Sequence, residues 1–244
     1  MSSEPDNVSN SWRAVSVNPV APEVHHHLLR RLSAIRELPH GTWDEQLGSW
    51  CRDRTVLDIG CVEHDPSHYD APGWRHGLLA RHAARLVGVD ILATEVATLR
   101  QRGFDIRCVD ATSDADLGER FARVVLGDVI EHVDDPVRLL RFAARHLDAA
   151  GEITVTTPNP FFIGHILRAI REGTFIANAE HVSWITPTNA IELGHRAGLE
   201  LIRYIPLWGP LTPDRLVFKL LQHIARRPPE MMAGAYAYVY ARRP

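Results

Sequence analysis

The 244-residue chain is 45% hydrophobic and carries a formal net charge of −3 from 27 basic and 30 acidic residues. It is long enough to bury a full core, and the absence of a long run of one charge sign disfavours a nucleic-acid or membrane partner. The three scattered cysteines, the lack of a signal-peptide pattern and the lack of a long apolar run predict a soluble cytoplasmic protein. Nothing in the sequence indicates the oligomeric state.

The N-terminal part of the chain differs in pattern from the rest. Residues 1–22 are polar and proline-containing, which predicts a mobile tail. Helical periodicity follows over about residues 23–38 and 43–52. We therefore expect a single domain over residues 23–244, in which a helical cap of about residues 23–53 precedes an α/β core of about residues 54–244.

Short apolar runs then alternate with helical patterns. The expected strands cover residues 55–59, 86–90, 104–108, 122–127, 151–156, 199–205 and 235–241. The expected helices cover residues 76–84, 93–102, 135–147, 161–171 and 187–197. This alternation predicts a Rossmann-like, doubly wound, mostly parallel sheet of seven strands, and the period-two tyrosines of residues 235–241 favour a final antiparallel strand.

Acidic residues follow three of the expected strands. In such a sheet the ligand crevice lies outside the carboxyl ends of the strands. Asp90, at the end of the second strand, stands where a carboxylate holds ribose hydroxyls in nucleotide-binding units, and Asp110 could accept a hydrogen bond from an exocyclic adenine amine. The alternative is that each acid only caps the helix after it.

Five stretches in chain order carry a family resemblance: VLDIGC, VGVD, CVDAT, ARVVLGDVIEHVDDP and GEITVTTPNP. Together they resemble the class I S-adenosylmethionine-dependent methyltransferases, nearest the branch of the ubiquinone-biosynthesis O-methyltransferases. The later stretch HVSWITPTNAIELGHRAGLELI is similar to the same branch. The resemblance covers about residues 54–205.

The resemblance implies a role for each matching residue. Asp58 and Gly60, with Cys61 beside them, would approach the methionine end of S-adenosylmethionine. Gly127 would line the floor of the methyl-donor site. The remaining cofactor-binding positions lie after the second and third strands, for the ribose and the adenine: Asp90, Ile91, Asp110 and Ala111.

The loop after the first strand departs from the family pattern. Val62, Glu63 and His64 stand where glycines are usual, and about ten extra residues lie within DPSHYDAPGWRHG. Prolines and a glycine predict that residues 66–73 are non-helical. One interpretation of residues 62–77 is a lid or substrate wall, and the other is a surface excursion with Trp74 tucked back into the core.

Asp128, Glu131 and His132 share one face if their segment is helical. With His181 they would suit a divalent metal such as Mg²⁺. The alternative is that Glu131 and His132 are hydrogen-bonding groups beneath the substrate, and that a neutral His132 or His181 accepts a proton as the catalytic base.

These observations predict S-adenosylmethionine-dependent methyl transfer to a small-molecule acceptor, with a hydroxyl group as the expected methyl acceptor, in secondary metabolism. The sequence leaves two alternatives open. One is a non-catalytic binding or partner subunit with the methyltransferase fold, and the other is a nicotinamide-dependent oxidoreductase.

Overall fold

The computed structural model describes residues 11–62, 66–208 and 230–243. The first ten residues of the expected N-terminal tail, and Glu63 and His64 of the loop, lie outside these residues. The chain divides into two compact units, Met1–Arg36 and Glu37–Pro244. None of the helices in the described part of the chain combines the length and apolar character needed to cross a lipid bilayer.

The first unit contains a short 3₁₀ helix, η1 (Trp12–Ala14), and the helix α1 (Pro22–Ile35). Pro22 occupies the first turn of α1, where a proline costs no helical hydrogen bond. Arg36 has extended backbone angles, so α1 ends three residues earlier than the expected boundary at residue 38.

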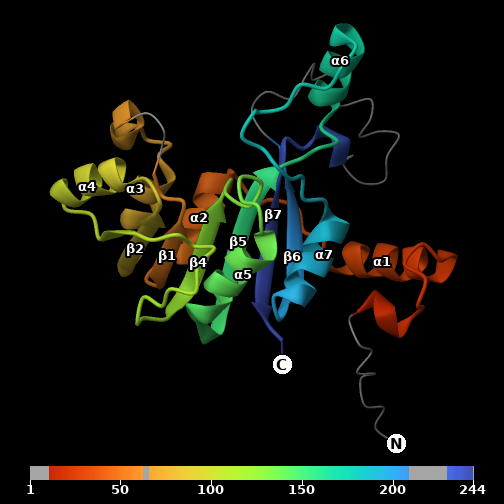
Figure 1. Ribbon diagram of the computed structural model, residues 1–244, viewed down its shortest axis with the longest axis horizontal. Coiled ribbons are helices and arrows are strands. Elements are labelled where there is room, and N and C mark those ends of the chain that lie inside the picture. The colour runs from red at the N-terminus through yellow and green to blue at the C-terminus, as the bar shows by residue number, and fades with distance from the viewer. Residues whose placement is uncertain (1–10, 63–65, 209–229, 244) are drawn as a thin grey trace, which may run out of the picture. The chain divides into compact units, whose positions relative to one another are not determined.

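The second unit is built on one seven-stranded sheet with the order β3-β2-β1-β4-β5-β7-β6 (Figure 1). Its strands are β1 (Thr55–Ile59), β2 (Arg85–Asp90), β3 (Ile106–Cys108), β4 (Phe121–Gly127), β5 (Leu147–Pro158), β6 (Leu199–Leu207) and β7 (Ala235–Arg242). Only β7 among these strands runs antiparallel, and it pairs with both β5 and β6. The expected Rossmann-like sheet with a final antiparallel strand is confirmed.

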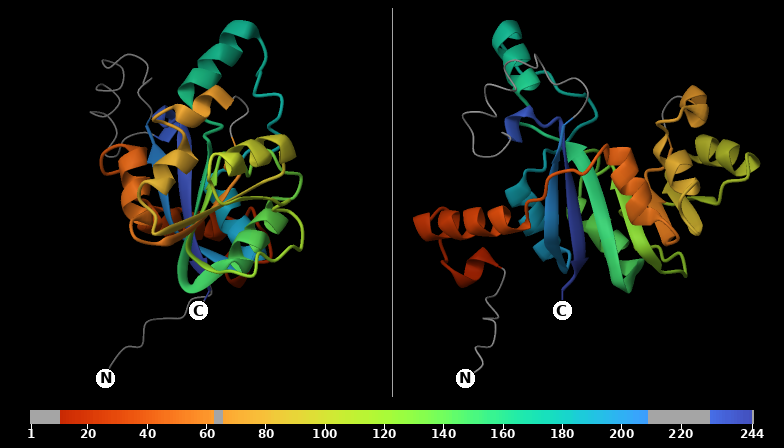
Figure 2. Two further views of the ribbon diagram at one scale, coloured as in Figure 1. Left: turned by 90° about the vertical axis from the view of Figure 1, so that its left-hand side faces the viewer. Right: turned by 180° about the vertical axis from the view of Figure 1, so that it is seen from behind.

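Helices cover both faces of the sheet (Figures 1 and 2). They are α2 (Trp43–Cys51), α3 (Arg75–Ala80), α4 (Ala93–Gln101), α5 (Pro136–Arg145), α6 (Ile163–Glu172) and α7 (Pro187–Arg196). On one face Leu47 of α2 and Leu79 of α3 pack with Val56 and Val125 of the central strands. On the other face lie α5 and α7, whereas α6 extends beyond the carboxyl ends of the parallel strands.

The period-two tyrosines of β7 place this strand inside the sheet. Tyr238 and Tyr240 are completely buried. Their hydroxyls donate to the carbonyls of Ile185 and Ala190, at 2.9 and 3.1 Å. Each buried hydroxyl therefore has a partner, and β7 is tied to the segment that begins α7.

One expectation about local structure is wrong, and one condition set by the sequence is not met. Residues Pro66–Asp70 form a short 3₁₀ helix, η2, in the stretch predicted to be non-helical. Proline is tolerated at the first position of a helix, where no backbone N–H is needed. The segment 128–132 is an irregular turn and not a helix, because Asp128 has a left-handed backbone with φ of 52°.

Candidate active site

The strand order reverses between β1 and β4, which lie side by side in the middle of the sheet. A crevice for a ligand is expected outside the carboxyl ends of strands at such a switch point. The residues that follow β1, β2, β3 and β4 meet at this edge, so the sequence-predicted residues from Asp58 to Gly127 are brought to one region.

Asp58, in β1, is fully buried and its carboxylate has two cationic or hydrogen-bonding neighbours. Arg75 Nε donates to one oxygen at 3.2 Å, and His76 Nδ1 lies 3.0 Å from the other. Burial by itself would raise the pKa of Asp58, but the Arg75 charge and the His76 hydrogen bond outweigh it and hold the pKa below its ordinary value. Asp58 is therefore an ionised group that fixes Arg75 and His76 at the end of β1.

The chain turns sharply after β1. Gly60 has φ of 70°, and a side chain there would collide with Val129. The Cys61 carbonyl accepts from the Trp74 indole N–H at 3.3 Å, and Cys61 itself is buried. The backbone N–H of Val62 donates to Asp90 at 3.1 Å, so the first residues of the loop are held against β2.

Two aromatic residues of the long loop pack inward. Tyr69 and Trp74 are buried in a cluster with Val96, Leu99 and Ile106. The Trp74 ring also contacts Phe104, with ring centres 5.1 Å apart. Trp74 therefore lies in the core, as the second interpretation of this loop expected, while a lid role for residues 62–77 stays a prediction.

The acids after β2 and β3 differ in their surroundings. One Asp90 oxygen accepts from the Val62 N–H and the other from the Leu92 N–H, both at 3.1 Å. The next residue, Ile91, is 66% exposed. Asp110 is exposed and accepts two hydrogen bonds from Thr112, which lower its pKa, and Ala111 beside it is buried.

The turn after β4 separates the residues that a helix would have aligned. The Asp128 side chain is exposed, whereas Glu131 is completely buried and His132 is partly buried. Among the residues that the structure describes, no donor hydrogen-bonds to either carboxylate oxygen of Glu131. Asp128 is therefore not a member of the group of possible metal ligands, which consists of Glu131, His132 and His181.

His181 reaches Glu131 from about fifty residues farther along the chain. The backbone N–H groups of Val182 and Ser183 both donate to the Glu131 carbonyl, at 2.9 and 3.2 Å. The rings of His132 and His181 lie 4.8 Å apart, edge to face. One possible ligand atom from each of Glu131, His132 and His181 lies within 4.8 Å of the other two.

Burial controls the protonation of this group. It raises the pKa of Glu131 to about 7, and the nearby charge of Asp128 adds to the rise. It also lowers the pKa of His181, and His132 adds to that fall. His181 is therefore a neutral imidazole at neutral pH, and its buried Nδ1 has no hydrogen-bond partner among the described residues.

The domain described as "Methyltransferase domain" matches this chain over residues 23–204, which is most of its length. The chain belongs to the methyltransferase family. The resemblance to S-adenosylmethionine-dependent methyltransferases is thereby confirmed, and a nicotinamide-dependent oxidoreductase is not supported.

Two relatives point the same way. A probable S-adenosylmethionine-dependent methyltransferase of Mycobacterium tuberculosis is 32% identical over 117 residues, which are 47% of this chain and 39% of that protein. A ubiquinone biosynthesis O-methyltransferase of Coxiella burnetii is 26% identical over 176 residues, 64% of this chain and 70% of that protein. The chain spans only about two fifths of the length of the mycobacterial relative.

Solved structures share the fold. The CcbJ methyltransferase of Streptomyces caelestis superposes with a TM-score of 0.57 at 13% identity and covers 82% of this chain and 88% of that one. Magnesium protoporphyrin IX methyltransferase of Synechocystis, solved with bound S-adenosylhomocysteine (SAH), gives 0.53 at 12% identity, with 90% and 94% covered. Identities this low show the fold alone.

The chemistry of the residues at these strand ends is compatible with the adenosine half of S-adenosylmethionine. Two backbone N–H groups occupy only part of the acceptor capacity of the Asp90 carboxylate, which leaves lone pairs for ribose hydroxyls. Ile91 offers exposed apolar surface next to it. The methionine half would meet Arg75, whose guanidinium contacts the carbonyls of Gly60 and Gly127.

Sequence reasoning missed Arg75. It lies in the loop segment GWRHG, for which the sequence predicts only a lid or a surface loop. The available signal was that a buried Asp58 needs a cationic partner, and Arg75 lies immediately before the expected helix of residues 76–84. Trp184, whose ring centre lies 5.7 Å from that of His181, was also missed.

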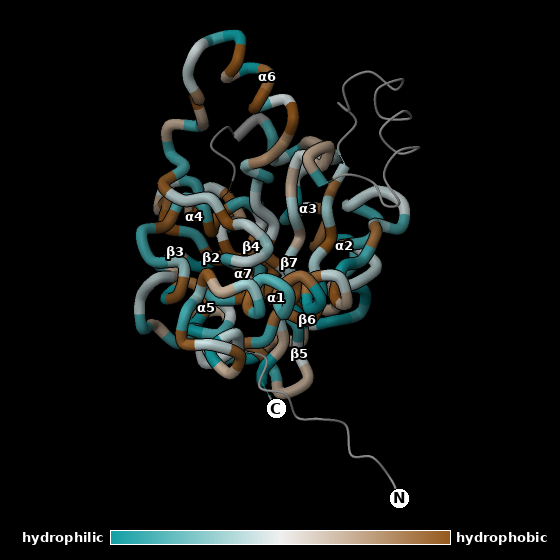
Figure 3. The backbone as a smooth tube through the Cα atoms, turned by 90° about the vertical axis from the view of Figure 1, so that its right-hand side faces the viewer, coloured by the Kyte–Doolittle hydropathy of each residue, from teal (hydrophilic) through white to brown (hydrophobic). Residues whose placement is uncertain are grey.

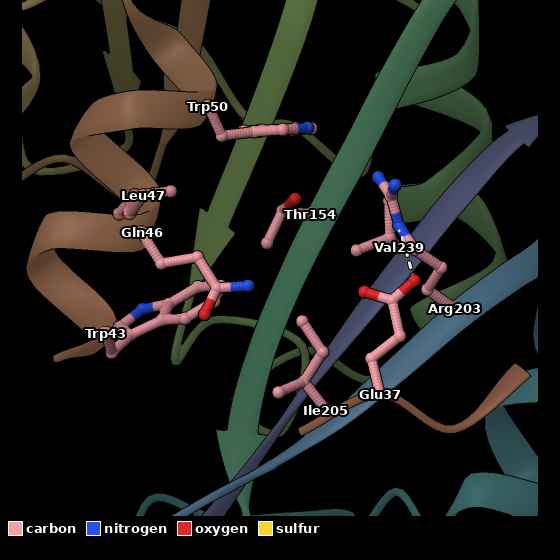
Figure 4. Close-up of a pocket in the computed structure, with 9 residues that line it drawn as sticks. All are labelled: Glu37, Trp43, Gln46, Leu47, Trp50, Thr154, Arg203, Ile205 and Val239. Carbon is pink, nitrogen blue, oxygen red and sulfur yellow. Dashed lines mark ion pairs between the residues drawn. The ribbon is translucent and has the colours of Figure 1, made fainter. Parts of the chain in front are cut away.

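A separate cavity of about 110 Å³ lies between α2 and strands β5, β6 and β7 (Figure 4). It is lined by residues that include Trp43, Trp50, Thr154 and Arg203. None of the predicted site residues lines it. It is therefore distinct from the crevice at the strand ends.

Proposed function

We propose that the chain transfers a methyl group from S-adenosylmethionine to a hydroxyl group of a small cytoplasmic molecule. The observation that carries the proposal is the group that His181 forms with Glu131 and His132 of the turn after β4, with unpaired buried acceptor atoms. Methyl transfer to a hydroxyl needs in-line positioning of the two reactants and a group that receives the hydroxyl proton. A role in secondary metabolism stays a prediction.

An acceptor hydroxyl would not have to displace a protein hydrogen-bond donor, among the described residues, from the proton-accepting groups. His181 is neutral and its Nδ1 is unpaired, and both Glu131 oxygens are unpaired. Any of these atoms can accept a hydrogen bond from an acceptor hydroxyl and then its proton. Such general base catalysis contributes roughly 10²- to 10⁴-fold to a rate.

Rings extend from this group toward α6 and supply an apolar wall for the acceptor. His181 contacts Trp184, and Trp184 contacts Phe175 and His165 with ring centres 5.6 and 6.0 Å apart. Phe162, immediately before α6, contacts His165 at 5.5 Å. These contacts favour an acceptor with apolar or planar parts over a highly charged one.

A metal ion is a second version of the same proposal. The donor set of one carboxylate and two imidazoles fits a divalent ion, and the unpaired atoms of Glu131 and His181 support it. Without Asp128, two nitrogen donors favour Mn²⁺ or Zn²⁺ over the Mg²⁺ that the sequence predicted. A bound ion would lower the pKa of an acceptor hydroxyl.

The test is transfer of label from S-adenosylmethionine to a panel of phenols and aliphatic alcohols, with the product position assigned by NMR. For His181→Ala we expect kcat to fall by about 10² or more, whereas SAH affinity is retained. His40→Ala, a change of an exposed histidine, is the matched control.

Two outcomes decide between the versions. Full activity in the presence of a chelator would exclude a metal ion from the mechanism. If a chelator abolishes activity and added Mn²⁺ or Zn²⁺ restores it, the metal version is supported. SAH binding with no transfer to any hydroxyl, and transfer to amines instead, would contradict the hydroxyl acceptor. SAH binding with no transfer to any acceptor would favour the non-catalytic alternative.

A further inference from the structure

Arg75, the first residue of α3, bridges the two central strands at the crevice. Its Nη2 donates to the Gly60 carbonyl at 2.6 Å, and its Nη1 donates to the Gly127 carbonyl at 3.0 Å. Its Nε donates to Asp58 at 3.2 Å. One guanidinium therefore satisfies acceptors from the ends of both β1 and β4.

The backbone is shaped around this side chain. A side chain in place of the hydrogen of Gly127 would collide with the Arg75 guanidinium. Gly60 is in a left-handed conformation, which turns the chain directly beneath the guanidinium. The missing side chain of Gly127 leaves room for the guanidinium, and the carbonyls of Gly60 and Gly127 with the Asp58 carboxylate form a cradle of acceptors that suits a cation.

The methyl donor brings a cation of its own to this edge. Its α-ammonium carries three N–H donors, which need acceptors when they leave water. The carbonyls of Gly60 and Gly127 and the carboxylate of Asp58 are such acceptors at the switch point, and Arg75 already uses all three. Two cations cannot occupy the same cradle without strong repulsion.

We infer that Arg75 is a specificity-determining residue that occupies the ammonium position of the methyl donor and must leave it before the amino-acid end of the donor can bind. The inference rests on the proposed donor. The Arg75 side chain is 22% exposed, so it can move toward solvent. Asp58 keeps His76 as a hydrogen-bond partner when Arg75 leaves, so its carboxylate is not stranded.

This arrangement affects only ligands that carry the amino-acid end. SAH must displace Arg75, whereas adenosine uses the Asp90 region alone. In Arg75→Ala we expect SAH to bind about tenfold more tightly or better, because a charge-assisted interaction no longer has to be broken. We expect the affinity for adenosine to stay unchanged.

The experiment is calorimetric titration of the full chain with SAH and with adenosine, for wild type, Arg75→Ala and Arg75→Gln. Glutamine removes the positive charge but keeps an N–H donor for Asp58 and part of the side-chain volume, so this variant serves if Arg75→Ala fails to fold. Arg100→Ala, a change of an exposed arginine on α4, is the control and should bind both ligands as wild type does.

A tighter SAH complex with unchanged adenosine affinity in either Arg75 variant supports the inference. Unchanged or weaker SAH binding in the folded variants would overturn it and would instead indicate an arginine that holds the donor carboxylate or takes no part. Failure of wild type and variants to bind both ligands would overturn the proposed donor, and the inference with it.

Discussion

Asp58 is fully buried, yet it stays ionised because Arg75 and His76 each contact one of its oxygens. A buried charge without such partners would be strongly destabilising. Glu131 presents the opposite case, since it is equally buried but has no donor among the described residues, and its pKa is raised to about 7. The two carboxylates therefore serve different purposes, one structural and one available to a ligand.

Acid should destabilise the fold partly through Asp58. Its pKa in the folded state lies below that in the unfolded chain. The ionised group therefore stabilises the fold above the ordinary aspartate pKa of about 4, and this contribution is lost as the pH falls through the folded-state pKa. Urea unfolding between about pH 2 and pH 6 should show the loss in wild type.

The comparison variants are Asp58→Asn and Asp148→Asn, the second a change of an exposed aspartate. Asp58→Asn should be less stable near neutral pH and should lose stability less steeply in acid. Asp148→Asn should follow wild type. Equal acid dependence in Asp58→Asn and wild type would show that Asp58 is not the group responsible.

At the scale of elements, the segment between β5 and α7 connects the site to the surface. It contains α6, in which Leu167 and Ile170 are 55% and 74% exposed. Figure 3 shows hydrophobic residues, coloured brown, along α6. The later part of the segment lies against the Glu131 turn through Val182 and Ser183. The position of His181 thus depends on how this segment enters α7.

The start of α7 should be a measurable source of stability. Thr186 and Asn189 form a capping box, in which each side chain accepts from the other residue's backbone N–H at 3.2 and 3.1 Å. Thr186→Ala should lower the free energy of unfolding by about 1 kcal/mol, as measured in urea. Thr186→Ser keeps the acceptor and should stay close to wild type, so equal losses in both variants would argue against capping.

At the scale of the whole molecule, the sheet lies entirely within the unit Glu37–Pro244. Its last strand, β7, lies between β5 and β6 and carries the buried tyrosines 238 and 240. The strand β7 is therefore an interior strand of the sheet, as β1 is. The family match ends at residue 204 and so does not include β7, a strand on which the sheet depends.

Two truncations should separate the units. A chain that begins at Glu37 should unfold cooperatively and bind SAH, because all strands and the crevice residues remain. A chain that ends at Gly234 lacks β7, which leaves β6 without a partner strand and one edge of β5 unpaired, and it should not fold. Circular dichroism during thermal unfolding measures both, and loss of cooperative unfolding in the first variant would contradict the independence of the second unit.

The sequence by itself determined the elements and the fold. Apolar runs such as RLVGVD and ARVVLG form buried strands because local composition decides strand formation, and acids after strands mark the crevice because parallel strands end at one edge. Asp58, Asp90 and the period-two tyrosines of β7 could therefore be located from the sequence.

Only the tertiary structure decided which side chains meet. The expected grouping of Asp128 with Glu131 needed a helix, and the left-handed backbone of Asp128 prevents one. Arg75 reaches Gly127 and His181 reaches Glu131 across about fifty residues of chain. Sequence spacing records neighbours within one element, whereas these contacts depend on crossover connections that bring separate strand ends together.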